Sequence, residues 1–295
     1  TVSFCGRSTL TAGRPITIYD PLTTDPVTGA RQPFPGNRIP ANRINAVGSN
    51  MVQYLPLPNV NPTVDNGTAN YVAQNTPNNL GQQFAGKLDH HFNSNVALSG
   101  VYVYQYTEEP AVSFFPDAPF AQGGQNNRPV HVGVINNTYV MNSSTVLTLR
   151  GGFNTFDDIT PLLAPFDAHT LGFNPAFADA IPVQRFPALT LTGYQGASYT
   201  GQGTTHYYSY GTNGALTKLA GEHSLKVGAD YRRLGVRSRT YGNSAGSFTF
   251  SGQFTGSNAT SPAATSRNAI ADLLLGYPSA GTLPINSQVD DFVNY

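Results

Sequence analysis

The fold is indicated most clearly by YYSYGTNGALTKLAGEHSLKVGADYRRLGVRSRT (residues 207–240). This stretch reads as two long strands joined by a short turn at Ala220-Gly221-Glu222. In the second strand one face carries Leu225, Val227, Ala229 and Tyr231, and the other carries Lys226, Gly228, Asp230 and Arg232. Both strands exceed the roughly 5–6 residues usual in globular proteins and reach the ~9–11 that a membrane-crossing strand needs. The pattern predicts a hairpin from the wall of a transmembrane β-barrel.

The composition excludes several classes of protein. Charged residues make up 11% of the 295 residues, against about 25% in a usual soluble domain, and apolar residues make up 39%. No window of ~18 apolar residues could span a bilayer as a helix. The net charge is zero, with 16 basic and 16 acidic residues, which argues against nucleic-acid binding. A low charge with many glycines and aromatic residues favours a barrel with an apolar belt, a polar interior and long loops.

The chain divides into a loop-rich and a strand-rich part. Residues 1–82 contain closely spaced prolines and turn formers, and we expect an extracellular segment with one short helix, from Asn42 to Leu55. We expect barrel strands over residues 83–295, and a second short helix from Ser266 to Leu275, which Gly276 ends. Besides the hairpin above, the expected strands are Gln83–Phe92, Val96–Thr107, His131–Val140, Thr145–Phe156, Ser247–Thr255 and Gln288–Tyr295.

The spacing of the strands is asymmetric. Turns of two to four residues alternate with connections of roughly twenty to fifty residues, as in outer-membrane barrels with short periplasmic turns and long extracellular loops. We therefore predict an all-β fold, a partial antiparallel transmembrane barrel forming an open curved sheet of about 8–10 strands. The first residues lack a signal peptide and the last ones stop within a strand, so we expect a fragment of a longer secreted chain.

Several segments together resemble TonB-dependent outer-membrane receptors of the Oar-like, acidobacterial type. The similarity lies in ITIYDPLTTDPVTGARQPFPGNRIPANRINAVGSNMVQYLPLPN (16–59), FAGKLDHHFNSNVALSGVYVY (84–104), GEHSLKVGADYRRL (221–234), GSFTFSGQFTG (246–256) and RNAIADLLLGYP (267–278). The resemblance implies a 22-stranded barrel of a Gram-negative outer membrane, filled by a plug domain and driven by the inner-membrane TonB complex. No TonB box, plug or regulatory-like domain is recognisable in these residues, so energised transport would belong to the parent receptor.

Two sets of side chains are candidates for function. Charged residues within strands should face the lumen, because a lipid-facing Arg or Lys at the bilayer midplane costs about 2–4 kcal/mol. The lumen or plug-facing candidates are Lys87, Asp89, Arg150, Lys226, Asp230 and Arg232. Aromatic residues near strand ends should lie at the membrane interface. The interface candidates are Tyr102, Tyr104, Tyr106, Tyr207, Tyr208 and Tyr210, for which an ordinary aromatic core or a glycan-binding loop are alternatives.

Catalytic and metal-binding patterns are weak. Adjacent His90 and His91 point to opposite faces of a strand, and no HExxH or His/Cys spacing is present. The single Cys5 cannot form an intrachain disulfide, and none of Ser94, Ser144 and Ser224 lies in GxSxG. Acidic pairs such as Asp157-Asp158 sit at strand ends, where solvated charges are the usual role. We expect no enzyme, no cofactor and no metal site.

The sequence thus predicts a fragment of an outer-membrane TonB-dependent receptor that binds and imports an unidentified solute. Its expected partners are outer-membrane lipid, the plug domain of the parent chain, the TonB complex and the solute. The alternative is a secreted or cell-surface β-rich adhesin or carbohydrate-binding module; an extracellular hydrolase is a third class without a recognisable site. A barrel requires that Leu225, Val227, Phe248 and Phe250 face lipid, whereas a sandwich would seal them in a dry interior.

Overall fold

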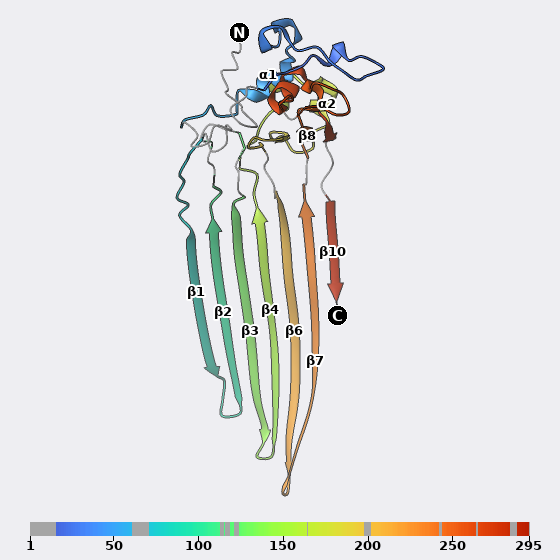
Figure 1. Cartoon of the computed structure of the whole chain (residues 1–295). Coiled ribbons are helices and arrows are strands. Elements are labelled where there is room, and N and C mark those ends of the chain that lie inside the picture. The colour runs from blue at the N-terminus through green and yellow to red at the C-terminus, as the bar shows by residue number, and fades with distance from the viewer. Residues whose placement is uncertain are drawn as a thin grey trace.

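The structure is a computed structural model that describes residues 16–60, 71–112, 115, 119–120, 124–163, 165–197, 202–241, 244–263, 265–283 and 288–294. Cys5 and the other residues before Ile16, which begin the expected loop segment, lie outside these residues. The described chain forms two parts, a long open sheet, here called the wall, and a compact unit at one end of it, here called the cap (Figure 1).

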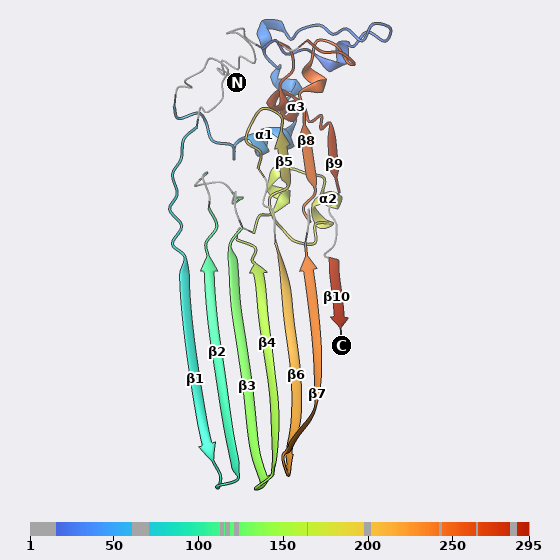
Figure 2. The ribbon, with the colours of Figure 1, turned by 60° about the horizontal axis from the view of Figure 1, so that its bottom comes forward.

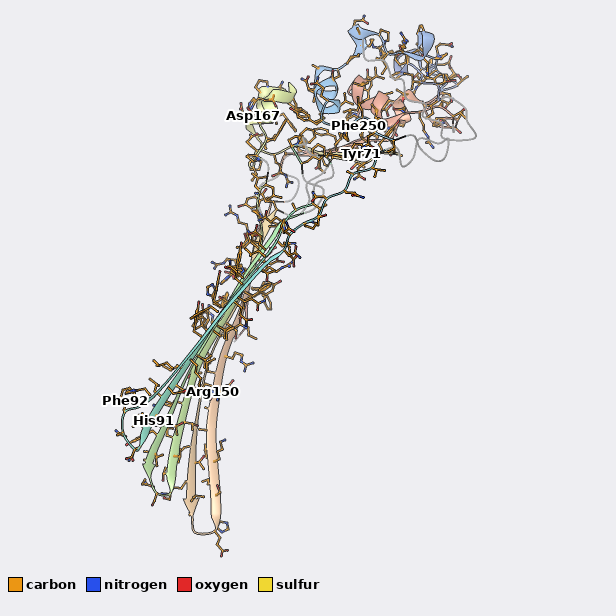
Figure 3. All side chains as sticks on the ribbon, turned by 90° about the vertical axis from the view of Figure 1, so that its left-hand side faces the viewer. Tyr71, His91, Phe92, Arg150, Asp167 and Phe250 are labelled. Atoms are coloured by element: carbon orange, nitrogen blue, oxygen red, sulfur yellow. The ribbon has the colours of Figure 1, made fainter. Side chains whose placement is uncertain are left out.

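The wall is a seven-stranded sheet in which every pair of neighbours is antiparallel. Its strands, in spatial order, are β1 (Leu80–His91), β2 (Val96–Glu109), β3 (Asn126–Asn142), β4 (Thr145–Thr160), β6 (Gly203–Ala220), β7 (His223–Thr240) and β10 (Gln288–Asn294). β1 and β10 form its two edges, so the sheet is an open section of a barrel. Seen edge-on, the wall is a single twisted layer with side chains on both sides (Figure 3).

The hairpins predicted from the sequence are present, with their tight turns at one end of the wall. β6 and β7 pair from Ala220–His223 upward, so the turn consists of Gly221 and Glu222. The β1–β2 turn is closed by Asn93, whose Oδ1 accepts from the backbone N–H groups of Asn95 (2.8 Å) and Val96 (2.9 Å). The connections β2–β3, β4–β6 and β7–β10 all lie at the opposite end (Figure 1). The expected asymmetry of short turns and long connections is therefore confirmed.

The cap contains the helices and a small second sheet (Figure 2). In this sheet β8 (Ser247–Phe250) lies between β5 (Ala188–Leu191), parallel to it, and β9 (Ala280–Thr282), antiparallel to it. The α-helices are α1 (Ala46–Val52), α2 (Pro175–Asp179) and α3 (Ala269–Leu275), and the 3₁₀-helices are η1 (Pro21–Thr23), η2 (Pro35–Asn37), η3 (Ala41–Arg43), η4 (Ala168–Leu171) and η5 (Gln253–Thr255). None of the described helices is both long and apolar enough to cross a bilayer.

The cap has a dry apolar core, unlike the wall. Its fully buried side chains come from distant parts of the chain: Met51, Phe120, Leu171, Leu189, Phe250 and Leu273. Tyr54 packs edge-on against Phe166 and Phe186, with ring centroids 5.4 and 5.5 Å apart. Burying one such side chain contributes about 1.5–3 kcal/mol, so this cluster holds the long connections together.

One predicted barrel strand was wrong. Residues Ser247–Thr255 were expected to cross the membrane, but β8 ends at Phe250 and belongs to the cap. Phe250 is only 4% exposed, and Phe248 stacks on Phe173 with centroids 5.5 Å apart. Gly252 then takes φ +83°, which a residue with a side chain rarely adopts, and turns the chain into η5. The wall consequently has seven strands among the described residues, fewer than the eight to ten expected.

Both predicted helices exist but are shorter than expected. α1 begins at Ala46, after the N-cap Asn45, whose Oδ1 accepts from the N–H of Gly48 (3.0 Å). α3 begins at Ala269 with Asn268 as its N-cap, instead of Ser266. Ser266 is buried and accepts from the N–H of Ser257 (2.9 Å). Gly276 ends α3 as predicted.

Candidate functional site: the two faces of the wall

The cross-strand register assigns every wall residue to one of two faces. Directly paired residues point to the same side, and successive residues alternate. We call the side that carries Lys87, Arg150 and Asp230 the polar face, and the side that carries Leu88, Leu149 and Val227 the apolar face.

The apolar face is covered by no other element of the described chain. Leu225 and Val227, which had to face lipid for a barrel, are 62% and 63% exposed. They belong to a larger set of exposed apolar side chains on this face: Phe84, Leu88, Tyr102, Ile135, Tyr139, Leu149, Phe153, Tyr210, Leu216 and Tyr231. So continuous an apolar surface over six strands would not be stable in water. The prediction for Leu225 and Val227 is confirmed, whereas Phe250 is buried and Phe248 half-buried in the cap.

The height of the apolar face fits a membrane. On β4 the face is apolar from Leu147 up to Phe153 and becomes polar at Thr155; on β7 it stays apolar up to Tyr231 and becomes charged at Arg233. Phe153 and Tyr231 each lie about nine residues from their turn, which at ~3.4 Å per residue and a tilt near 40° spans about 25 Å. This equals the height of the apolar band of outer-membrane barrels.

The interface aromatics divide between the two faces. Tyr102, Tyr104 and Tyr106 share the apolar face of β2, and Tyr208 and Tyr210 share it on β6. The hydroxyl of Tyr102 lies 2.8 Å from Nδ1 of His131 on the next strand. Tyr207 points the other way, because it precedes Tyr208 by one residue and successive residues of a strand alternate between the faces. It lies on the polar face, where its ring stacks on that of Phe156 with centroids 5.5 Å apart. Tyr207 therefore does not share the lipid-facing side with the other five tyrosines.

The six charged candidates all lie on the polar face, as their alternation predicted. Three of them belong to one cross-strand row that crosses six strands and contains no apolar residue: Asp89, Ser99, Asn136, Arg150, Asn213 and Asp230. Arg150 donates from Nε to Oδ1 of Asn136 within this row. Lys87 Nζ lies 2.8 Å from Asp89 Oδ2 with both side chains half exposed or more. Figure 3 shows Arg150 on the wall, far from the cap.

Lys226 and Arg232 occupy the same face at different heights. Lys226 pairs with Thr217 near the β6–β7 turn. Arg232 pairs with Gly211 and lies in the same cross-strand row as Lys87. The structure thus places all six on one side, spread over the length of the wall rather than gathered at one point. Whether they contact a plug or a solute stays a prediction.

The apolar face carries one shallow groove. Its floor contains Gly86, Gly100, Gly133 and Gly151, on four successive strands, and Tyr210 lies at its edge. The volume is about 760 Å³ and the groove is open to its surroundings. The glycines leave little side-chain bulk on the floor, but the ring of Phe153 covers Gly133, which is buried.

The cap contains a buried charged network that sequence reasoning missed. The carboxylate of Asp272 in α3 accepts hydrogen bonds from Thr255 N (2.9 Å), Thr255 Oγ1 (2.8 Å) and Phe254 N (3.2 Å). Burial raises the pKa of Asp272 to about 6 despite these hydrogen bonds. Arg31 holds the other side of η5, donating from Nη1 to the carbonyl oxygens of Gln253 (2.8 Å) and Phe254 (2.9 Å).

This network is structural in character, because all its hydrogen bonds join one segment of the cap to another. A signal in the sequence was the single acidic residue in the otherwise apolar run AIADLLL (269–275). A second charged contact joins Arg43 to both carboxylate oxygens of Asp20 (2.9 and 3.0 Å) and holds the pKa of that carboxyl below its usual range.

Histidine, cysteine and acidic side chains form no group of three or more suited to a metal within the described residues. Nδ1 of exposed His169 lies 2.7 Å from Asp167 and its Nε2 lies 3.0 Å from Asp179, which raises the pKa of the histidine. Since its two ring nitrogens point to different carboxylates, this arrangement is a pair of ion contacts at the cap surface.

An apolar, membrane-high outer side, a polar inner row and hairpins with turns at one end define a section of a membrane barrel. The profile described as "Outer membrane beta barrel domain" matches residues 4–294. The chain belongs to this family. Its wall is therefore a partial barrel embedded in the outer membrane of a Gram-negative bacterium, with the apolar face toward lipid. Comparisons with curated proteins and with solved structures gave no significant match.

Proposed function

We propose that this outer-membrane barrel section belongs to a TonB-dependent receptor of the Oar-like type, which binds and imports a solute. The proposal rests chiefly on the polar row from Asp89 to Asp230. A continuous row of charged and amide side chains on the inner face of the wall suits contact with a folded plug or a polar solute. An inner face that met only water would not need acidic and basic side chains in the same row.

The cap supports the same proposal. In outer-membrane barrels the long connections lie outside the cell and the short turns in the periplasm, which would place the cap at the extracellular mouth. A cap with a rigid core, instead of separate mobile loops, suits the first capture of a solute. Plug domain, TonB complex and solute are the proposed partners, and the proposed role is transport without catalysis.

A second candidate function is supported by the cap alone. A compact surface unit anchored by a barrel could act in adhesion or in carbohydrate binding, with no import. The two functions differ in what the cell takes up. Depletion of solutes from the medium, followed by mass spectrometry in cells with the receptor and with or without TonB, separates them. An adhesin gives the same depletion profile in both strains.

A conductance measurement tests the plugged state directly. The intact receptor that contains this chain is inserted in planar bilayers, and its KCl conductance is recorded before and after urea is added to about 4 M. Urea at this concentration is expected to unfold a plug while the wall persists. A plugged receptor shows little conductance until urea is added. A pore that is open from the start contradicts the proposal.

A further inference from the structure

Two directly paired glycines interrupt the side chains of the polar face. Gly152 on β4 pairs with Gly211 on β6, so two neighbouring positions of this face carry no side chain. A β carbon at position 211 would lie 3.6 Å from its nearest listed neighbour, the backbone oxygen of Tyr231, which is an ordinary contact distance. The strand therefore has room for a side chain at Gly211, and packing of the wall does not explain the glycine.

Two arginines border this glycine pair. Arg232 on β7 pairs directly with Gly211, and Arg150 is the next polar-face residue below Gly152 on β4. At ~4.8 Å between strands and ~3.4 Å per residue, the Cα atoms of the two arginines lie about 12 Å apart, with the glycine pair between them. Both side chains are exposed, and Figure 3 shows Arg150 on the wall away from the cap. Because each guanidinium ends a long side chain, both can contact one ligand that lies over the pair.

The donors of the two arginines are largely unused. Nε of Arg150 donates to Oδ1 of Asn136, which orients the guanidinium. Its Nη groups, and the whole guanidinium of Arg232, make no hydrogen bond or ion pair with any other residue that the structure describes. Asp230, two residues before Arg232, is the carboxylate beside them in the register, and it forms no ion pair within the described chain. Two cations and one anion around the glycine pair favour a negatively charged ligand.

Neutral polar side chains complete the border. Asn213 pairs with Arg150 and lies directly below Gly211 on β6. Asn154 and Ser209 pair with each other on the opposite side of the glycine pair, on β4 and β6. The amide and hydroxyl groups of these three residues add neutral hydrogen-bond donors to the two guanidinium groups. The glycine pair is thus bordered by donors on two strands and by an arginine on the third.

We propose that Arg150 and Arg232 bind an oxyanionic group of the solute, a phosphate or a carboxylate, over the Gly152–Gly211 pair. Guanidinium groups bind both kinds of oxyanion in a bidentate manner. A plug could contact the wall at the level of its side chains, whereas two bare positions between unused guanidinium groups suit one small group of a solute. The inference rests on the proposed function, because it assumes that the polar face lines the path of a solute, and it adds the charge of that solute.

Isothermal titration calorimetry tests the proposal on the intact receptor in detergent, without the TonB complex. Inorganic pyrophosphate and succinate are the two probes, and the one that binds more tightly indicates whether the solute group is a phosphate or a carboxylate. The test variant combines Arg150→Gln with Arg232→Gln, and we expect the affinity for that probe to fall at least about tenfold. The control combines Arg237→Gln with Arg239→Gln, which removes two arginines from the opposite face of β7, and should stay within about twofold of wild type.

A second variant keeps both arginines and fills the bare position. Gly211→Val places a branched side chain over the glycine pair, and should weaken binding of the same probe at least about tenfold. Gly100→Val is its control, because position 100 lies on the apolar face and a β carbon there meets nothing within 4 Å. Heat-modifiable migration in gels shows which variants are folded, and a folded Gly211→Val decides the question if the double arginine variant does not fold.

Three results overturn the proposal. They are the absence of binding of both probes to the wild-type receptor, unchanged binding by a folded test variant, and binding that begins only after urea has released a plug. The last result would assign the arginines to the plug. Import fails separately: equal uptake with and without TonB refutes the proposed transport but leaves oxyanion binding intact, whereas TonB-dependent uptake by a receptor that binds neither probe refutes this inference alone.

Discussion

Gly48 in α1 packs directly against the backbone carbonyl of Leu273 in α3. A β carbon at position 48 would overlap that oxygen, so the two helices can approach this closely only because Gly48 has no side chain. The contact joins the N-terminal segment of the cap to its C-terminal segment, and the core side chains Met51 and Leu273 lie beside it.

Gly48→Ala should therefore separate α1 from α3 and destabilise the cap by about 1–3 kcal/mol, the usual cost of overpacking. Because the obstacle is backbone, rotation of a side chain cannot relieve it. Proteolysis of the cap on intact cells should become faster. Gly81→Ala is the control, since a β carbon there meets nothing within 4 Å; equal cleavage of the two variants would contradict the prediction.

The stability of the cap should depend on the protonation of Asp272. Its pKa is about 6 in the folded cap against 3.8 for an unperturbed carboxyl, so the folded state binds the proton more tightly than the unfolded state. The contribution of Asp272 to the free energy of unfolding is therefore greatest below pH 4 and falls as the pH rises from about 4 to 6. Above pH 6 the cap is less stable by roughly 3 kcal/mol than below pH 4.

Hydrogen exchange of the α3 amides, corrected for intrinsic rates, should show this loss of protection between pH 4 and 6. Asp272→Asn should remove that part of the pH dependence. Asp230→Asn, on the wall, serves as the control and should leave the α3 profile as in wild type. Identical profiles for wild type and Asp272→Asn would show that the carboxyl does not govern the stability of the cap.

Arg31→Lys should weaken the cap although the charge is kept. The guanidinium contacts the carbonyl oxygens of Gln253 and Phe254 through Nη1, and Oγ1 of Thr24 through Nε at 2.9 Å. A lysine ammonium cannot reproduce this fork, and we expect a loss of about 1–3 kcal/mol. Arg38→Lys, at an exposed position of the same segment, is the matched control. Thermal unfolding of the purified receptor should show a lower transition temperature for Arg31→Lys alone.

Val227→Arg should impair insertion of the barrel. The side chain points to lipid from the middle of the apolar band, where an arginine costs about 2–4 kcal/mol. Thr217→Arg introduces the same residue nearby, on the polar face beside Lys226, and should be tolerated. Heat-modifiable migration of protein from outer membranes measures the folded fraction; similar fractions for both variants would mean that the faces have been assigned incorrectly.

Charge reversal at Lys226 and Arg232 should alter uptake if the polar face contacts plug or solute. The variant Lys226→Glu with Arg232→Glu changes two lumen charges, while Glu222→Lys changes a charge in the turn. Uptake is compared at equal surface expression. Normal uptake by the double variant would leave these residues with a scaffold role only.

The wall was predictable because its signal is local. In a strand such as Leu225 to Arg232, apolar and polar residues alternate with a period of two, which a short stretch of sequence already shows. The turn at Gly221 and Glu222 then fixes the register between this strand and the preceding one. All six charged candidates therefore fell on one face as expected. The placement of Tyr207 was missed because aromatic residues were grouped by their proximity to strand ends, without regard to the alternation.

The cap was not predictable in the same way. The segment around Phe248 and Phe250 alternates as cleanly as any wall strand, yet its partners are β5 and β9. A period of two indicates a strand with two different environments, but it does not distinguish lipid from a protein core. The contact of Arg31 with η5 spans more than two hundred residues, and no pattern within a single segment could reveal it.

The core of the cap has a consequence for the order in which the protein assembles. Met51, Phe120, Leu171 and Leu273 come from segments separated by complete hairpins, so they meet only after those hairpins have paired side by side. In the proposed orientation, each connection crosses the membrane before the core of the cap can form. A folded cap thus indicates that the wall strands have paired correctly. Resistance of the cap to a protease added outside the cell would distinguish correctly assembled molecules from those whose hairpins have not yet paired.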